Sequence, residues 1–106
     1  MAIFKKGVFI IIKKVGIIRV ITTDDDFILY SHGKKLQTFL PDLKFITKAI
    51  PDQPFGVYDK KTENEAVPKI LKMASQMEKN GVNAILISCC SDPGLKEVKN
   101  AVSIPV

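Results

Sequence analysis

Two adjacent thiols, Cys89 and Cys90, are the first candidates for chemistry in this sequence. They follow a short apolar run, residues 84–87, which lies between Gly81 and a Pro-Gly pair at residues 93–94. The run is too short for a helix, and its composition predicts a strand buried on both faces. Because ligands bind beyond the carboxyl ends of strands in open α/β sheets, the thiols stand where a site is expected.

The residues after the thiols, Ser91, Asp92 and Pro93, predict the start of a helix, with Ser91 or Asp92 as its cap. Cys89 would then face the positive end of that helix, which lowers the pKa of a thiol and favours reactivity. A small buried side chain is the alternative for Cys89, and spacing alone supports both equally. Strand alternation turns Cys90 to the opposite face, where packing is the simpler role.

A second group of polar residues follows the first predicted strand, residues 15–21. Thr22 and Thr23 come directly after it and, with three aspartates at residues 24–26, predict the cap and acidic first turn of a helix. The carboxyl ends of parallel strands meet at one edge of a sheet. Thr22 and Thr23 can therefore face the same crevice as Cys89.

His32 lies in the middle of the helix predicted over residues 26–40. This position is typical of a partly exposed histidine without a catalytic partner. A structural zinc site needs four ligands, and the chain offers one histidine and two cysteines far apart in sequence. We therefore expect no bound metal. Neither a dinucleotide-binding G-x-G-x-x-G after the first strand nor a P-loop pattern occurs.

Predicted strands and helices alternate along the chain. This alternation favours a parallel, doubly wound sheet with right-handed crossovers, in a three-layer αβα arrangement of the flavodoxin-like kind. The expected elements are a strand at 15–21, a helix at 26–40, a strand at 43–50, a long loop at 51–61, a helix ending at Gly81, a strand at 84–87, a helix at 94–100 and the start of a strand at 103–106.

The helix before Gly81 has two possible starts. Thr62 and Glu65 have the spacing of a capping box. Pro68 would remove a hydrogen bond from a helix interior, so we expect the helix either to begin near Pro68 or to have a distorted first turn.

The 106 residues, 46% of them hydrophobic, are enough for one small domain with a core. We place this domain at residues 14–106 and interpret residues 1–13 as an N-terminal extension or an edge strand. The apolar run at residues 7–12 is broken by Lys13 and Lys14 and no small-residue cleavage site follows, which argues against a signal peptide. The run is also too short to span a bilayer, so we expect no membrane insertion.

The net charge of +5 arises from 16 Lys and Arg against 11 Asp and Glu, and the lysines occur as scattered pairs. No aromatic residues are interleaved with a basic block, so the charge favours solvation over nucleic-acid binding. Two adjacent cysteines cannot cross-link distant parts of a fold. Their pattern is typical of a cytoplasmic protein rather than of a secreted disulfide framework.

Residues 81–95 (GVNAILISCCSDPGL) and 103–106 (SIPV) resemble the signature G-x-D-A-[IV]-x-[IV]-x-C-F-x-D-P-G-L … I-P-V of the aspartate/glutamate/hydantoin racemase superfamily. Residues 15–23 are similar to the opening strand of that family, and residues 65–68 to its helix before the cysteine strand. The resemblance extends from Lys14 to the last residue. It makes Cys89 the catalytic cysteine and places Cys90 where the family often has Phe.

The resemblance implies racemisation without a cofactor. One thiolate removes the α-proton of an amino acid or hydantoin, and a second thiol returns a proton from the opposite face. The enolate-like charge formed between these steps must be stabilised. The hydroxyl groups of Thr22, Thr23 and Ser91 are the candidate substrate-binding donors, together with the backbone N–H groups after Cys89. The implied partner is a small amino acid or related carboxylate.

Members of this superfamily consist of two similar halves, each contributing one cysteine to the cleft between them. This sequence has no second cysteine at a matching remote position, so the resemblance is to one half, the amino-terminal one, of a pseudo-symmetric enzyme. We expect a complementary half-domain, or a homodimer that brings two Cys89 thiols to a shared cleft. A non-catalytic domain that binds small carboxylates, and a lyase or decarboxylase of the same superfamily, are the alternatives.

Overall fold

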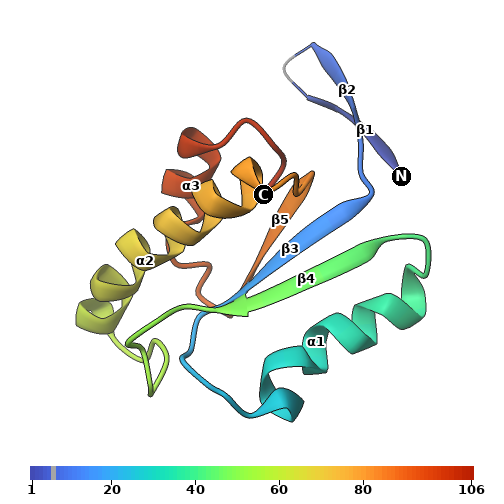
Figure 1. The fold of residues 1–106 in the computed structure, drawn as a ribbon. Helices are drawn as coiled ribbons and strands as arrows, with labels where there is room; N and C mark the ends of the chain where they lie inside the picture. The colour runs from blue at the N-terminus through green and yellow to red at the C-terminus, as the bar shows by residue number, and fades with distance from the viewer. Residues whose placement is uncertain (6) are drawn as a thin grey trace.

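A parallel sheet of three strands forms the centre of the protein (Figure 1). The computed structural model describes residues 1–5 and 7–106. The strands β3 (Lys14–Arg19), β4 (Lys44–Ala49) and β5 (Ala84–Ser88) lie in the order β4-β3-β5, and both pairings are parallel. The predicted α/β class and parallel sheet are therefore confirmed.

Helices cover both faces of the sheet, which makes three layers (Figure 1). The helix α1 (Asp26–Phe39) lies on one face and packs mainly against β4. The helices α2 (Lys60–Lys79) and α3 (Leu95–Ala101) pack against each other on the opposite face. This arrangement is compatible with the predicted flavodoxin-like αβα fold.

The main apolar core lies between the sheet and the pair of helices α2 and α3. Alternate positions of the strands, such as Ile18 in β3 and Ile87 in β5, turn toward these helices because successive side chains of a strand point to opposite faces. The buried members of this core are Ile18, Val20, Ile50, Ala66, Ile70, Ala74, Met77, Val82, Ile85, Ile87, Val98 and Val102.

The opposite face of the sheet is only partly covered. Gly33 brings α1 close to the sheet, since a Cβ at this position would stand 3.5 Å from Cδ1 of Ile17 and 3.0 Å from Oγ1 of Thr47. Ile17 is fully buried there, whereas Leu86 of β5 is 39% exposed. The α1 side of β5 is therefore more open than the α1 side of β3.

The start of α2 differs from the predicted capping box. Asp59 is the N-cap: its carboxylate accepts hydrogen bonds from the backbone N–H of Thr62 at 2.8 Å and from the Thr62 hydroxyl at 2.7 Å. The Thr62 hydroxyl oxygen in turn accepts from the N–H of Asp59. The prediction of Thr62 as the cap with Glu65 was wrong, because Thr62 occupies the third helical position of a reciprocal pair that begins at Asp59.

Pro68 lies inside α2 and not at its start, so both predictions for the beginning of this helix were wrong. The helix begins at Lys60, more than one turn before Pro68, and Asp59 caps it there. Pro68 is exposed, and on that side water can satisfy the carbonyl group of Asn64, which Pro68 leaves without an amide donor.

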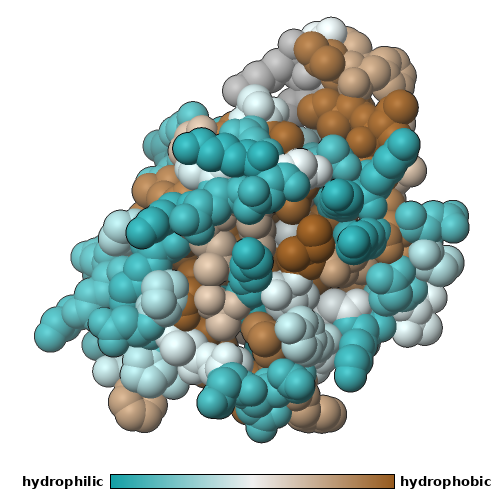
Figure 2. All heavy atoms as spheres, viewed as in Figure 1, coloured by the Kyte–Doolittle hydropathy of each residue, from teal (hydrophilic) through white to brown (hydrophobic). Residues whose placement is uncertain are grey.

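The N-terminal residues form a separate antiparallel hairpin that extends away from the sheet (Figure 1). Its strands are β1 (Ala2–Lys5) and β2 (Val8–Ile11). Phe4 and Phe9 stack edge to face and are 66% and 73% exposed, and this end of the molecule is strongly apolar in Figure 2. Lys6, which belongs to the predicted extension at residues 1–13, lies outside the described residues, and the boundary between 13 and 14 stays a prediction.

The C-terminal segment runs beside β5. Residues 103–106 form no strand, but the backbone N–H of Ile85 donates to the carbonyl oxygen of Pro105 at 2.9 Å. The prediction that a strand starts at residues 103–106 was therefore wrong, since the segment makes this bond to β5 without strand pairing. Over the described ranges 1–5 and 7–106, no helix has the length and apolar composition needed to cross a membrane.

Two glycines, Gly16 in β3 and Gly33 in α1, test the packing on the two faces of the sheet. A Cβ on Gly16 would stand 2.5 Å from Sδ of Met77 and 3.2 Å from Cγ1 of Val82, so we expect Gly16→Ala to lower the free energy of unfolding by about 1–3 kcal/mol. Urea denaturation measures the change. The matched control is Gly33→Ala, where a gain in helix propensity of about 1 kcal/mol offsets the tight contact with Thr47. Equal loss in both variants would contradict the packing described at Gly16.

Candidate functional site

The three parallel strands end at the same level, so their following loops share one edge of the sheet. Arg19, the last residue of β3, is in register with Ala49 of β4 and with Ser88 of β5. The loop after β3 carries Thr22 and Thr23, and the loop after β5 carries Cys89 and Ser91. The edge is the place where open α/β sheets bind ligands.

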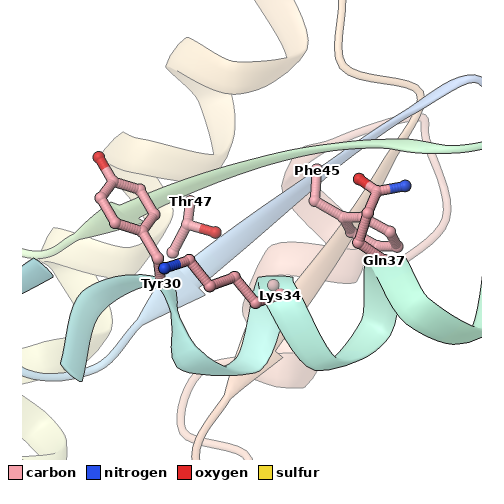
Figure 3. Close-up of a pocket in the computed structure, with 6 residues that line it drawn as sticks. Tyr30, Lys34, Gln37, Phe45 and Thr47 are labelled. Atoms are coloured by element: carbon pink, nitrogen blue, oxygen red, sulfur yellow. The ribbon is translucent and has the colours of Figure 1, made fainter. Parts of the chain in front are cut away.

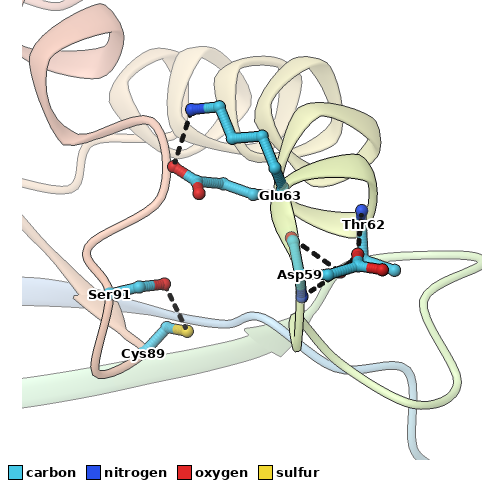
Figure 4. A network of polar contacts seen from close by, with 6 residues as sticks. Asp59, Thr62, Glu63, Cys89 and Ser91 are labelled. Carbon is cyan, nitrogen blue, oxygen red and sulfur yellow. Dashed lines mark hydrogen bonds and ion pairs between the residues drawn. The ribbon is translucent and has the colours of Figure 1, made fainter.

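Cys89 is partly buried at this edge. Its side chain packs against the core between the sheet and the helices α2 and α3, and its Sγ lies 3.7 Å from Oγ of Ser91. Figure 4 shows the two side chains directed toward each other in the loop after β5. The thiol is therefore neither enclosed in the apolar core nor fully exposed, and it has a hydroxyl group as a hydrogen-bond partner.

The helix after Cys89 begins later than predicted. Its N-cap is Gly94, in the left-handed conformation with φ 74°, and no side chain caps it. Two successive turns precede the helix: the N–H of Asp92 donates to the carbonyl oxygen of Cys89, and the N–H of Leu95 donates to that of Asp92. The prediction that Ser91 or Asp92 caps the helix was wrong, since the chain needs these turns to reverse direction before α3. The short α3 is thus separated from Cys89 by a loop.

Cys90 is exposed, so the prediction that it serves packing was wrong. The strand ends at Ser88, and the alternation that would have turned Cys90 into a packed face no longer applies two residues beyond it.

Thr22 and Thr23 are both used in the local structure. The Thr22 hydroxyl donates to the carbonyl oxygen of Ile50 and accepts from the N–H of Gln53, both at 2.6 Å, which ties the ends of β3 and β4 together. The Thr23 hydroxyl oxygen accepts from the N–H of Asp25. Asp25 is the N-cap of α1, as one of the predicted capping residues.

Gln53 is a site residue that the sequence did not indicate. It is only 4% exposed, and its side-chain amide donates to the carbonyl oxygens of Gly56 and Thr62. Its Oε1 accepts from Nζ of Lys69, which also donates to the carbonyl oxygen of Asp52. Gln53 therefore holds the loop between β4 and α2 in place. The surrounding prolines marked a loop but not a buried amide.

His32 has a partner that the sequence could not show. Its Nδ1 is hydrogen-bonded to Oγ of Ser88, the last residue of β5. Arg19 lies on the same face, where its Nη1 donates to the carbonyl oxygen of Ile28 at 2.6 Å and to Oγ of Ser31 at 3.4 Å. These polar side chains thus form a cluster at the edge of the sheet, on the face that α1 covers. Cys89 packs on the opposite face, against the core below α2 and α3.

The pKa values of His32 and Asp59 are shifted from their ordinary values. Partial burial, with the positive charges of Arg19 and Lys35, lowers the pKa of His32 below its ordinary value of 6.5. The hydrogen bonds that the Asp59 carboxylate accepts from Thr62 lower the pKa of Asp59 below 3.8. His32 is therefore held in its neutral form at pH 7, and Asp59 is ionised.

Surface cavities are found elsewhere on the molecule. One of about 200 Å³ lies between α1 and β4, where Tyr30, Lys34, Gln37, Phe45 and Thr47 line it together with Gly33 (Figure 3). Another, of about 130 Å³, is formed by the loop after β4 and includes Gln53. Neither is lined by Cys89. No group of three or more His, Cys, Asp or Glu residues that could hold a metal ion occurs within the described chain.

Comparison with protein families gives a match to the Asp/Glu/hydantoin racemase family over residues 34–106, which is more than half of the chain. The chain belongs to this family. The match includes β5, Cys89 and the loop after them. It begins at Lys34 and not at Lys14, so β3 lies outside it, and it covers the C-terminal part of this chain without identifying an amino-terminal half of an enzyme. A search of curated proteins finds no match.

Membership of the Asp/Glu/hydantoin racemase family supports a racemase-like function and the binding of a small carboxylate. The structure brings Cys89 and Ser91 into contact, and it places Thr22 and Thr23 in the loop after the neighbouring strand. Their assignment to catalysis and substrate binding stays a prediction.

The buried amide of Gln53 gives a prediction for stability. Gln53→Ala removes the amide that donates to two buried carbonyl groups and accepts from Lys69, so we expect a loss of about 1–3 kcal/mol in the free energy of unfolding. Chemical denaturation monitored by circular dichroism measures it. Gln37→Ala is the matched control, because the exposed Gln37 amide also donates to three carbonyls but water can replace it there. A loss at position 37 as large as at position 53 would refute the role of burial.

The lowered pKa of His32 gives a prediction for pH. Because the folded state binds a proton at His32 less tightly than the unfolded state does, acidification through the ordinary value of 6.5 favours unfolding. We expect the free energy of unfolding to fall between pH 7.5 and pH 5.5, and to fall less in His32→Gln. The chain has one histidine, so no other imidazole contributes. The effect of Asp59 lies below its ordinary 3.8, outside this window. An identical pH profile in the variant would contradict the prediction.

Proposed function

We propose that the protein is a racemase-like isomerase in which the thiolate of Cys89 removes the α-proton of a small amino acid or related carboxylate, without a cofactor. The observation that carries this proposal is the position of Cys89: within the family match, at the carboxyl end of the central strands, and in contact with the hydroxyl group of Ser91. A partly exposed thiol at such an edge can be reached by a small substrate, which a cysteine in the core cannot.

The chemistry requires one proton to move and one negative charge to be stabilised. The thiolate of Cys89 takes the proton from the α-carbon, the electron pair of that C–H bond passes into the adjacent carbonyl group, and an enolate-like anion forms. Fixed donors must face the oxygen that becomes negative. Ser91, Thr23 and the N–H groups after Cys89 are the donors we assign to it.

Thr22 has a different task in this proposal. Its hydroxyl already joins the carbonyl oxygen of Ile50 to the N–H of Gln53. We therefore assign Thr22 to positioning the two loops that border the substrate, and not to direct binding through a free hydroxyl group. The loss of its hydrogen bonds would displace the loop after β4 relative to Cys89.

Inversion of the α-carbon needs a second acid on the other face of the substrate. The described residues place no second thiol opposite Cys89, since Cys90 follows it in the same loop and is exposed. We propose that residues 14–106 work as one half of a complete site and that the second half comes from a complementary domain or from a second copy of the chain. Two adjacent free thiols suit a reducing compartment, so we place the protein in the cytoplasm.

Hydrogen exchange at the α-carbon tests the proposed function. Proton NMR in deuterated water follows the loss of the α-proton signal of aspartate, glutamate and a 5-substituted hydantoin, because each deprotonation by the thiolate introduces deuterium. We expect Cys89→Ser to reduce the exchange rate at least a hundredfold, since a serine hydroxyl is a far weaker base at neutral pH than a thiolate.

Cys90→Ser is the matched control and should retain most of the exchange. Equal loss in both variants would remove the assignment of Cys89. Stabilisation of the protein by these compounds without any exchange would show a non-catalytic carboxylate-binding domain instead. Release of carbon dioxide from the substrate would show a decarboxylase of the same superfamily.

A further inference from the structure

Arg19 carries a positive charge at the carboxyl end of the central strand, and no acidic side chain among the described residues pairs with it. Its Nη1 is bound to the carbonyl oxygen of Ile28 and to Oγ of Ser31. Its Nε is buried and has no hydrogen-bond partner within the described chain. A buried donor of a charged group without an acceptor is unfavourable, and nearly all such groups in proteins are satisfied. The guanidinium group is therefore held in place but incompletely bound.

The neighbours of Arg19 are polar side chains without negative charge. Ser88 is its register partner on β5, and Oγ of Ser88 is bonded to Nδ1 of His32. Oγ of Ser31 accepts from Arg19 and donates to the carbonyl oxygen of Ile28. One guanidinium, one imidazole and two hydroxyl groups thus meet at one place, from three elements of the fold, with no carboxylate among them. The positive charge of Arg19, with no carboxylate beside it and uncharged polar groups around it, favours the binding of an anion at this place.

The place is accessible from solvent. His32 is exposed, Ser31 and Ser88 are partly exposed, and Leu86, which precedes the cluster on the same face of β5, is 39% exposed. The helix α1 packs mainly against β4 and leaves this side of β5 open. A small anion can therefore approach the cluster along β5, from the side that no helix covers.

We propose that Arg19, Ser31, His32 and Ser88 form a binding site for the carboxylate group of a small molecule, with Arg19 as its charged anchor. Its planar guanidinium keeps the bonds of Nη1 to Ile28 and Ser31 while Nη2 is left to donate a charged hydrogen bond to a carboxylate. The binding site is independent of Cys89. Its role as the subsite for a substrate carboxylate rests on the proposed function, since Ser88 immediately precedes Cys89 at the same edge of the sheet.

Titration with sodium succinate, followed by proton NMR of the His32 ring, tests the site. The chain has one histidine, so its ring signals are unique. Succinate has no stereocentre and cannot be racemised, so the readout is binding alone. We expect a saturable shift of these signals and a higher pKa of His32 in the presence of succinate, because the added negative charge favours the imidazolium form. Ionic strength is kept constant with sodium chloride.

Variants of Arg19 decide its role. We expect Arg19→Gln to weaken succinate binding at least about tenfold, as for the loss of a charged hydrogen bond, and Arg19→Lys to weaken it about threefold or more, because lysine lacks the planar fork. Thermal melting confirms that each variant is folded, and Arg19→Lys decides alone if Arg19→Gln does not fold. Lys35→Gln is the matched control: it removes a charge that also acts on His32 but lies outside the cluster, and binding should change less than about twofold.

Three results would overturn the proposal. These are no saturable shift, an equal loss of binding in the Arg19 and Lys35 variants, or tighter binding of inorganic phosphate than of succinate at the same ionic strength. The last result would identify a phosphate site. Succinate binding is measured without any α-proton exchange, so the two proposals fail separately. The carboxylate site stands if succinate binds as predicted and no exchange is found. It falls if the Arg19 variants bind succinate normally, even when exchange occurs.

Discussion

The register of three parallel strands is the constraint on which the rest of the structure depends. Arg19, Ala49 and Ser88 end their strands side by side, so the loops that follow leave from one edge. A slip of one residue in β5 would exchange the faces of Ser88 and Cys89, because side chains alternate along a strand. The apolar core prevents such a slip, since it would expose Ile85 and Ile87 and bury Leu86.

The same alternation gives the edge two polar surfaces. Cys89 packs on the side of α2 and α3 and meets Ser91, whereas Ser88 points to α1 and meets His32. Gln53 and Thr22 hold the loops between these surfaces by hydrogen bonds to backbone groups. Membership of the Asp/Glu/hydantoin racemase family supports the binding of a small carboxylate by this protein.

Local patterns in the sequence predicted local structure well. The apolar runs marked all three strands of the sheet, and the aspartates at residues 24–26 marked the start of α1, where Asp25 is the cap. Such patterns gave wrong helix starts where one residue is compatible with two positions at the beginning of a helix. Thr62 is compatible with the N-cap position and with the third helical position. Its hydrogen bonds to the Asp59 carboxylate show that it occupies the third position. The predicted start of α3 was also wrong, because two turns precede the helix.

By itself the sequence determined the order and type of the elements, the parallel sheet and the family signature around Cys89, because periodicity, capping residues and short motifs are local properties of the chain. Only the tertiary structure decided that Gln53 is buried, that His32 meets Ser88 across 56 positions of the sequence, and that Arg19 has no acidic partner among residues 1–5 and 7–106. These facts depend on which strand ends lie side by side and on which faces the helices cover. Such long-range packing leaves no periodic trace in any single segment.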